Sequence, residues 1–145
     1  MRLVSLGVAT LLAVVLPGCG GSEEEPAPAC AAVPGQATVA TGGSTINNYT
    51  LNLGSGSIHF TNDNGSFYAG TVDTEIANVG PVCLADVVAW PGGGVSLGYV
   101  PAVVDDAYVV QFTTRPGGVT TIKYARFVVR SYSAGVVTVT YVPSL

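Results

Sequence analysis

The sequence predicts an all-β domain, a small antiparallel β-sandwich or partly open barrel that ends in a three-stranded meander. Three observations lead to this fold class. No segment combines helical periodicity with capping residues. Val, Thr, Ile and Tyr, which are favoured in strands, are abundant along the chain. Gly or Pro interrupts the apolar runs about every 8–12 residues, which is typical of short strands joined by turns.

Composition limits the classes of function that the chain can perform. Its 145 residues are enough for one hydrophobic core. A hydrophobic share of 48% with only 10% charged residues argues against global disorder. Five basic residues against nine acidic ones argue against a nucleic-acid surface, which needs clustered Lys and Arg. With one His and three Cys, we expect no metal, no cofactor and no catalytic residues.

Residues 1–18 are predicted to be a signal peptide. Met1 and Arg2 form a short charged region, and residues 3–16 are almost entirely apolar. This apolar run is too short to span a bilayer, which needs about 20 residues. We therefore expect the chain to be exported.

The end of this segment, Leu16-Pro17-Gly18-Cys19, resembles the lipobox of bacterial lipoproteins. The resemblance implies that the Cys19 thiol receives a diacylglycerol and that the signal is cleaved before it. Because the residue that follows is Gly20 rather than Asp, it also implies sorting to the outer membrane of a Gram-negative bacterium. The alternative is an ordinary signal peptide with a chance cysteine.

A flexible acidic tether is expected over residues 19–29, followed by a single β-rich domain over residues 30–145. The tether contains Gly, Ser and Pro together with Glu23-Glu24-Glu25, and has no apolar periodicity. Its expected role is to hold the folded domain off the membrane.

If Cys19 carries lipid, Cys30 and Cys83 remain, and both lie in the exported part of the chain. Disulfides form and persist outside the cytoplasm, so we expect these two thiols to be bonded to each other. The alternative is two free buried thiols. A metal site is not supported, because the chain offers no second pair of ligands.

In the first two thirds of the domain, strands are expected at residues 36–41, 45–53, 57–61 and in part of 67–72. Asn64-Gly65 predicts a hairpin turn between the last two, because both residues tolerate positive φ. Residues 85–90 are expected to be a buried run.

The last third predicts an antiparallel meander over residues 107–142. Three runs show period-two alternation of their side chains, and Gly-containing turns separate them. On residues 121–130, one face is expected in the core and the other, with Tyr124, Arg126 and Arg130, at least partly wet. The expected core positions are Tyr108, Val110, Phe112, Ala125, Phe127, Val129, Val137, Val139 and Tyr141.

The meander resembles the C-terminal part of HmuY-like bacterial lipoproteins. A strand at residues 107–111 contains a tyrosine, a Tyr-Ala-Arg strand follows at residues 124–129, and a last strand at 136–141 ends in Tyr. The resemblance implies the fold and the envelope location. Members that bind haem use paired axial ligands, typically two His, whereas this chain has only His59.

The segment Gly94-Val95-Ser96-Leu97-Gly98 matches the G-x-S-x-G motif of hydrolases. In those enzymes the Ser lies on a turn from a strand into a helix. Here the motif follows a Gly-rich stretch and precedes a Pro, so we expect a loop that enters a strand. His59 and Asp86 complete a Ser-His-Asp set only on paper, and His59 is expected to face solvent between apolar Ile58 and Phe60.

Oxygen ligands for calcium are available at Asp63 with its neighbours Asn62 and Asn64, and at Asp105-Asp106. No calcium-loop spacing is present, so turn-capping roles are favoured. Aromatic side chains that offer a groove for sugar or peptide, but are more typical of half-buried strand positions, are Tyr49, Tyr68, Tyr99, Tyr108, Tyr124, Tyr132, Tyr141 and Trp90.

Together these features predict a lipid-anchored cell-envelope protein whose small β-domain is structural or binds an unidentified ligand or envelope protein. The membrane is its expected partner through the lipid. The alternatives are an HmuY-like lipoprotein that captures haem or another small ligand, and a secreted hydrolase.

Overall fold

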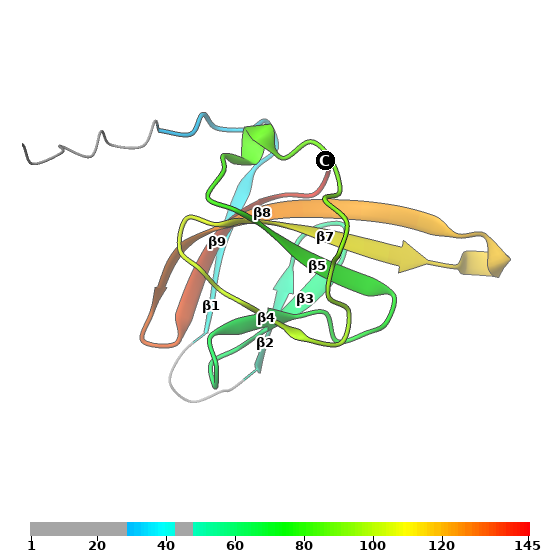
Figure 1. The fold of residues 1–145 in the computed structure, drawn as a ribbon, viewed down its shortest axis with the longest axis horizontal. Helices are drawn as coiled ribbons and strands as arrows, with labels where there is room; N and C mark the ends of the chain where they lie inside the picture. The colour runs from blue at the N-terminus through cyan, green and yellow to red at the C-terminus, as the bar shows by residue number, and fades with distance from the viewer. Residues whose placement is uncertain (1–28, 43–47) are drawn as a thin grey trace, which may run out of the picture.

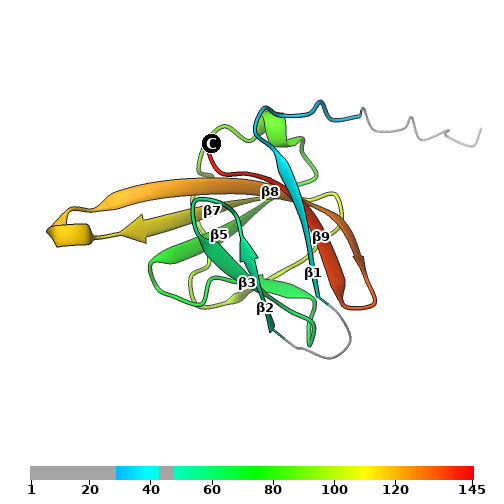
Figure 2. The same ribbon diagram turned by 180° about the vertical axis from the view of Figure 1, so that it is seen from behind.

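Two antiparallel sheets face each other in the computed structural model of the protein, which describes residues 29–42 and 48–145 (Figures 1 and 2). The larger sheet has five strands in the order β1-β9-β8-β7-β5, and the smaller has four in the order β2-β3-β4-β6. The sheets do not close into a barrel, so the fold is a β-sandwich. Within the described residues, no helix is long and apolar enough to cross a bilayer.

The strands are β1 (Ala37–Gly42), β2 (Asn48–Asn52), β3 (Ser57–Thr61), β4 (Ser66–Tyr68), β5 (Thr74–Gly80), β6 (Tyr99–Pro101), β7 (Ala107–Thr114), β8 (Thr121–Ser133) and β9 (Val136–Val142). Two short 3₁₀ turns complete the described elements, η1 (Leu84–Asp86) and η2 (Pro116–Gly118). The hairpin of β7 and β8 projects beyond the body of the sandwich in both views, with η2 at its tip.

The strands expected from local patterns are all present, and β6 is the strand that the Gly-rich loop was expected to enter, but β5 was not predicted. The expected buried run at residues 85–90 is wrong, because this segment forms η1 and a loop in which the Val88 side chain is 72% exposed. Its backbone does not pair with a strand. Instead, the Arg126 guanidinium donates hydrogen bonds to the carbonyl oxygens of Leu84 and Val87.

The meander of β7, β8 and β9 is confirmed, and its register places one face of each strand in the core. Eight of the nine predicted core residues are buried between the sheets, and Tyr141 is half-buried against them. Alternation fixes this arrangement, because a shift of one residue would turn every apolar side chain to the other face.

Four aromatic rings join the two sheets. Phe60 pairs with Phe67 across β3 and β4, and Tyr108 pairs with Phe127 across β7 and β8. The Phe67 ring also packs edge-on against the rings of Tyr108 and Phe127, with centroid distances of 5.4 and 4.9 Å. Edge-to-face packing of this kind adds to the stability gained from burying the rings.

The Tyr108 hydroxyl stabilises the connection from β6 to β7. It donates a hydrogen bond of 2.7 Å to the carbonyl oxygen of Pro101 and accepts one of 2.8 Å from the amide of Val103. Burial raises the pKa of this phenol above its ordinary value, because the charged form is poorly solvated there. The hydroxyl thus satisfies two backbone groups of the connection from inside the sandwich.

The outer face of β8 is wet only in part, and the burial of Arg126 is what the expectation for residues 121–130 did not include. Arg126 is only 8% exposed, and Tyr124 is half-buried, while Arg130 is exposed. The loop after β5 lies over this face and buries Val87 against the outward-facing Ala107 and Val109. The large sheet is therefore packed on both sides near its centre.

A β-bulge at Arg130 reverses the alternation of β8. The register passes directly from the pair Val129 and Val139 to the pair Ser131 and Thr138. Because one extra residue is inserted, Tyr132 turns toward the interior, and its ring packs edge-on against Phe60 at 5.4 Å. The ring closes one end of the sandwich, a position that strict alternation in the sequence does not predict.

The turn residues correctly predicted where the β3–β4 and β8–β9 hairpins reverse the chain, but not the type of each turn. In the β3–β4 hairpin only Gly65 has positive φ, at 59°, so the turn differs from the two-residue type expected from Asn64-Gly65. The β8–β9 hairpin is instead the two-residue type. Ala134 and Gly135 have φ of 50° and 78°, as a type I′ turn requires at both positions.

We predict that Phe127→Ala lowers the free energy of unfolding by about 3–5 kcal/mol, because it removes a fully buried ring and leaves a cavity. Urea denaturation of the wild type and the variant measures the difference. The matched control on the same strand is Ile122→Ala, whose side chain is exposed and whose loss is expected to cost roughly 0.5 kcal/mol or less. Equal losses at the two positions would contradict the assigned core.

We predict that Ala134→Gly stabilises the protein by about 0.5–1 kcal/mol. An alanine in the left-handed region is strained by its Cβ, and this relief exceeds the entropy that Gly adds to the unfolded chain. The control is Ala40→Gly on edge strand β1, which is expected to destabilise by a similar amount. Thermal unfolding of both variants gives the two signs, and a destabilised Ala134→Gly would exclude the type I′ turn.

Candidate functional site

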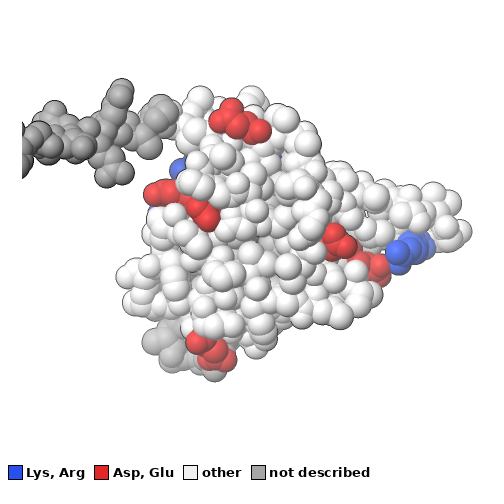
Figure 3. Space-filling model, viewed as in Figure 1, with Lys and Arg blue, Asp and Glu red and all other residues white. Residues whose placement is uncertain are grey.

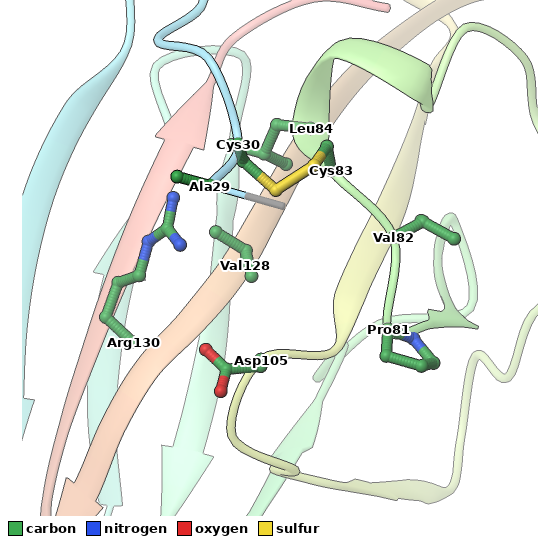
Figure 4. A pocket seen from close by; sticks show the side chains of 9 residues that line it. All are labelled: Ala29, Cys30, Pro81, Val82, Cys83, Leu84, Asp105, Val128 and Arg130. Carbon is green, nitrogen blue, oxygen red and sulfur yellow. A yellow bond between two sulfur atoms is a disulfide. The ribbon is translucent and has the colours of Figure 1, made fainter. Parts of the chain in front are cut away.

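A pocket of about 540 Å³ lies beside the disulfide at the end of the sandwich where the described chain begins (Figure 4). Val128 of β8 and Leu84 of η1 contribute apolar side chains, and Pro81 and Val82 form another wall. The volume lies within the range of small-molecule sites. The residues that line it are Ala29, Cys30, Pro81, Val82, Cys83, Leu84, Asp105, Val128 and Arg130.

Two charged residues of opposite sign border this pocket. Figure 4 shows Asp105 and Arg130 on different sides of Val128. Asp105 has a φ of 68°, and its amide donates a hydrogen bond of 2.8 Å to the carbonyl oxygen of Val129. The Arg130 Nε lies 3.4 Å from the hydroxyl of Thr140. The pocket therefore offers an apolar floor with a carboxylate and a guanidinium at its rim.

The disulfide between Cys30 and Cys83 confirms the predicted pairing, with Cα atoms 5.4 Å apart. It joins the start of the folded domain to the segment that enters η1. The Arg126 guanidinium then donates hydrogen bonds to the carbonyl oxygens of Leu84, the first residue of η1, and Val87, which follows η1. The covalent and hydrogen bonds together fix the loop over the large sheet and form one side of the pocket.

A second, smaller hollow of about 250 Å³ lies on the opposite side of the sandwich, at the outer face of the four-stranded sheet. Tyr68 of β4 and Tyr99 of β6 are directly opposite in the register, and their ring centroids are 5.5 Å apart with the planes at 59°. We call this hollow the tyrosine notch. Its lining residues are Tyr68, Gly70, Ser96, Leu97, Gly98 and Tyr99.

His59 supports the tyrosine notch from the neighbouring strand. Its ring stacks on Tyr68, with centroids 4.9 Å apart, and its Nδ1 lies 3.3 Å from the Thr50 hydroxyl. A Cβ at Gly70 would come within 2.8 Å of the His59 ring, so the ring needs a glycine there. His59 points to the outer face as predicted, but it is half-buried by these contacts.

The structure brings Ser96 and His59 to the borders of the same notch, since both lie beside Tyr68 and Gly70. Asp86 is elsewhere, because η1 packs over the outer face of the large sheet. The G-x-S-x-G segment continues into β6 rather than into a helix, as expected for a loop that enters a strand.

The candidate calcium residues occupy turns. Asp63 lies in the β3–β4 turn, where its amide is 3.4 Å from the Thr61 hydroxyl. The Asp106 carboxylate accepts a hydrogen bond of 2.8 Å from the Asn78 side chain. Among the described residues, no three His, Cys, Asp or Glu side chains gather in a geometry that suits a metal ion.

The aromatic side chains do not form one groove. Tyr108 is in the core, Tyr49 and Tyr141 pack against it, and Tyr132 closes its end. Tyr124 and Trp90 lie together on the outer face of the large sheet, with centroids 6.3 Å apart. Only Tyr68 and Tyr99, among the tyrosines of the described chain, line the tyrosine notch.

The sequence placed Tyr68 and Tyr99 among the aromatic residues that offer a groove, but it did not predict that these two meet, and it did not predict the pocket beside the disulfide. The tyrosine notch depends on the pairing of β4 with β6, which are separated by β5 and a long loop. The one local signal was the polar-side position of His59 and Tyr68 on alternating strands. The Asp105–Arg130 rim depends on the bulge in β8, which no local pattern of residues predicted.

Charge is sparse on the visible surface. Figure 3 shows a largely uncharged face, with small acidic groups near its edge and a basic group close to acidic ones at the projecting hairpin. There Arg115 and Asp73 form an exposed ion pair of 2.6 Å. An exposed pair of this kind contributes little stability, and the sparse charge leaves no broad electrostatic patch on this face.

Cys19 and the rest of the expected signal peptide and tether lie outside the described residues, apart from Ala29. No protein-family model, curated protein or solved structure matches the chain. The fold itself defines the class of protein, an antiparallel β-sandwich with one disulfide among its described residues. Its function is inferred from its own residues.

We predict that loss of the disulfide lowers the free energy of unfolding by about 4 kcal/mol, because it frees a loop with a sequence separation of 53 residues in the unfolded chain. Urea denaturation is compared between wild type and the double variant Cys30→Ser/Cys83→Ser. A reducing agent should destabilise the wild type by a similar amount and leave the double variant unchanged. Insensitivity of the wild type to complete reduction would contradict a stabilising role.

Proposed function

We propose that the protein is a lipid-anchored component of the cell envelope of a Gram-negative bacterium, held at the outer membrane through Cys19. Its β-sandwich is a non-catalytic binding module displayed at the end of the tether. The disulfide is the observation on which this proposal rests. It uses two of the three cysteines, which leaves Cys19 available for acylation, and it belongs to an oxidising compartment.

The position of the disulfide also suits a tethered domain. Cys30 is at the start of the sandwich, so tension in the tether passes to Cys83 before it reaches edge strand β1. The bond thereby protects β1 from being peeled away from β9. The two acyl chains of a diacylglycerol on Cys19 would anchor the protein stably, since a single chain gives only marginal membrane binding.

A binding role is favoured over a purely structural one by the two hollows. The tyrosine notch and the pocket beside the disulfide lie on opposite sides of a rigid scaffold. A non-catalytic role is favoured because His59, the imidazole beside the notch, contacts Thr50 and Tyr68, while Asp86 lies over the other sheet. Ser96 therefore lacks the base and carboxylate arrangement that activates a nucleophile. Binding groups held on strands in this way are well positioned for recognition.

We predict that Cys19→Ala moves the protein out of the membrane fraction or leaves the signal uncleaved, because the acylated thiol is the anchor. Fractionation of cells that express the full chain, together with mass spectrometry of the N-terminal peptide, measures both results. Cys30→Ser/Cys83→Ser is the control, since it removes two thiols and should remain with the membrane. Unchanged partitioning and processing of Cys19→Ala would overturn the anchor.

A further inference from the structure

We propose that the tyrosine notch binds a neutral sugar ring at one position along a glycan. The inference rests on the proposed binding role of the sandwich and names the ligand class, but it does not depend on the lipid anchor. The Tyr99 side chain is 59% exposed, although a tyrosine is large and apolar enough to gain from burial. An exposed ring beside a second ring is therefore available for a ligand.

The shape of the tyrosine notch suits one ring-sized group. Its volume of about 250 Å³ is below the range of roughly 300–1,000 Å³ for drug-sized ligands. The planes of the two tyrosine rings meet at 59°, with their centroids 5.5 Å apart. A pyranose ring presents a face of C–H groups, which are attracted to the negative face of an aromatic ring.

The other walls allow close approach. Gly70 and Gly98 have no side chains to obstruct the notch, and Leu97 is 77% exposed beside it. Ser96 adds a hydroxyl that can both donate and accept a hydrogen bond. The notch thus combines two aromatic walls, an apolar edge and one neutral polar group.

The surrounding sheet surface is neutral and polar. By alternation, the outer face of the four-stranded sheet carries hydroxyl, carboxamide, imidazole and phenol groups. No strand position on this face has Lys, Arg, Asp or Glu, so a charged ligand finds no partner on these strands. The positions that alternate to this face are Asn48, Thr50, Asn52, Ser57, His59, Thr61, Ser66, Tyr68, Tyr99 and Pro101, of which Thr61 and Ser66 are buried.

This chemistry favours a glycan over a proline-rich peptide. Sugar hydroxyls donate and accept hydrogen bonds, and so do the Ser, Thr and Asn groups of this face. A polyproline segment has only carbonyl acceptors, because its residues lack an N–H group. With such a segment, each exposed hydroxyl or carboxamide of this face could only donate a hydrogen bond, and its acceptor oxygen would stay unused.

One register row holds the notch in shape. Thr50, His59 and Tyr68 are successive partners across β2, β3 and β4, and Tyr99 follows on β6. The contact of His59 with Thr50 on one side and Tyr68 on the other fixes the Tyr68 ring. His59 is therefore a positioning residue that acts through Tyr68.

The test is a titration of the ¹⁵N-labelled full-length protein, in a detergent without a sugar headgroup, with maltohexaose, cellohexaose, chitohexaose and decaproline. We expect at least one hexasaccharide to shift the amide signals of Gly70, Ser96 and Gly98 with a Kd on the order of 1 mM, as for a single small contact site. Val88→Ala, an exposed truncation on the loop that covers the other sheet, is the control and should bind like the wild type.

Tyr99→Ala should weaken binding by about tenfold or more, because it removes one wall. Tyr99→Phe should bind within about threefold of the wild type, because the wall remains. The ¹⁵N spectrum of each variant verifies its fold. The proposal is overturned if no hexasaccharide shifts these signals, if Tyr99→Ala binds as well as the wild type, or if decaproline alone shifts them.

These outcomes are separate from the fate of the anchor. A Cys19→Ala variant that stays in the membrane fraction overturns the anchoring proposal and leaves a positive titration intact. Conversely, Cys19→Ala can leave the membrane fraction while no hexasaccharide shifts the amide signals. That result supports the anchoring proposal and overturns the sugar-binding proposal.

Discussion

The packing of the Phe67 ring against the opposite sheet is the interaction on which the position of β4 depends. Phe67 lies on the short strand β4, pairs with Phe60 in its own sheet and packs edge-on against Tyr108 and Phe127 of the other sheet. Because β4 has only three residues, backbone pairing alone would hold it weakly. The buried ring fixes the inward face of β4 and, by alternation, turns Tyr68 outward.

The same constraint therefore positions the tyrosine notch. Phe67 pairs with Val100 of β6, and both are buried, so their neighbours Tyr68 and Tyr99 must face outward together. The Tyr108 hydroxyl then binds the backbone on both sides of the turn after β6. The register of β4 with β6 thus both buries Phe67 and Val100 in the core and places Tyr68 beside Tyr99 on the outer face.

The connection from β5 to β6 covers the outer face of the five-stranded sheet near its centre. The disulfide fixes this connection at Cys83, Arg126 binds its carbonyl oxygens, and Val95 pairs with edge strand β5 before the chain enters β6. The pairing at Val95 also occupies part of an edge that would otherwise be open to another chain. A single long connection therefore covers a face, blocks an edge and places Ser96 beside the notch.

The amino-acid sequence by itself determined the features that depend on near neighbours. The alternation of residues 107–142 predicted the meander and its core face, because period two is a local property of strands. The pairing of Cys30 with Cys83 was predicted from expected export and cysteine parity, and the structure contains it. Turn residues located both hairpins, although the Asn64-Gly65 turn has only one residue with positive φ.

Only the tertiary structure decided what covers each face and which distant residues meet. Arg126 occupies a polar-side position on β8, yet the loop after β5 buries it. The bulge at Arg130 turns Tyr132 inward, and the pairing of β4 with β6 brings Tyr68 to Tyr99. These outcomes depend on contacts between segments far apart in the chain, and such contacts leave no periodic pattern in either segment alone.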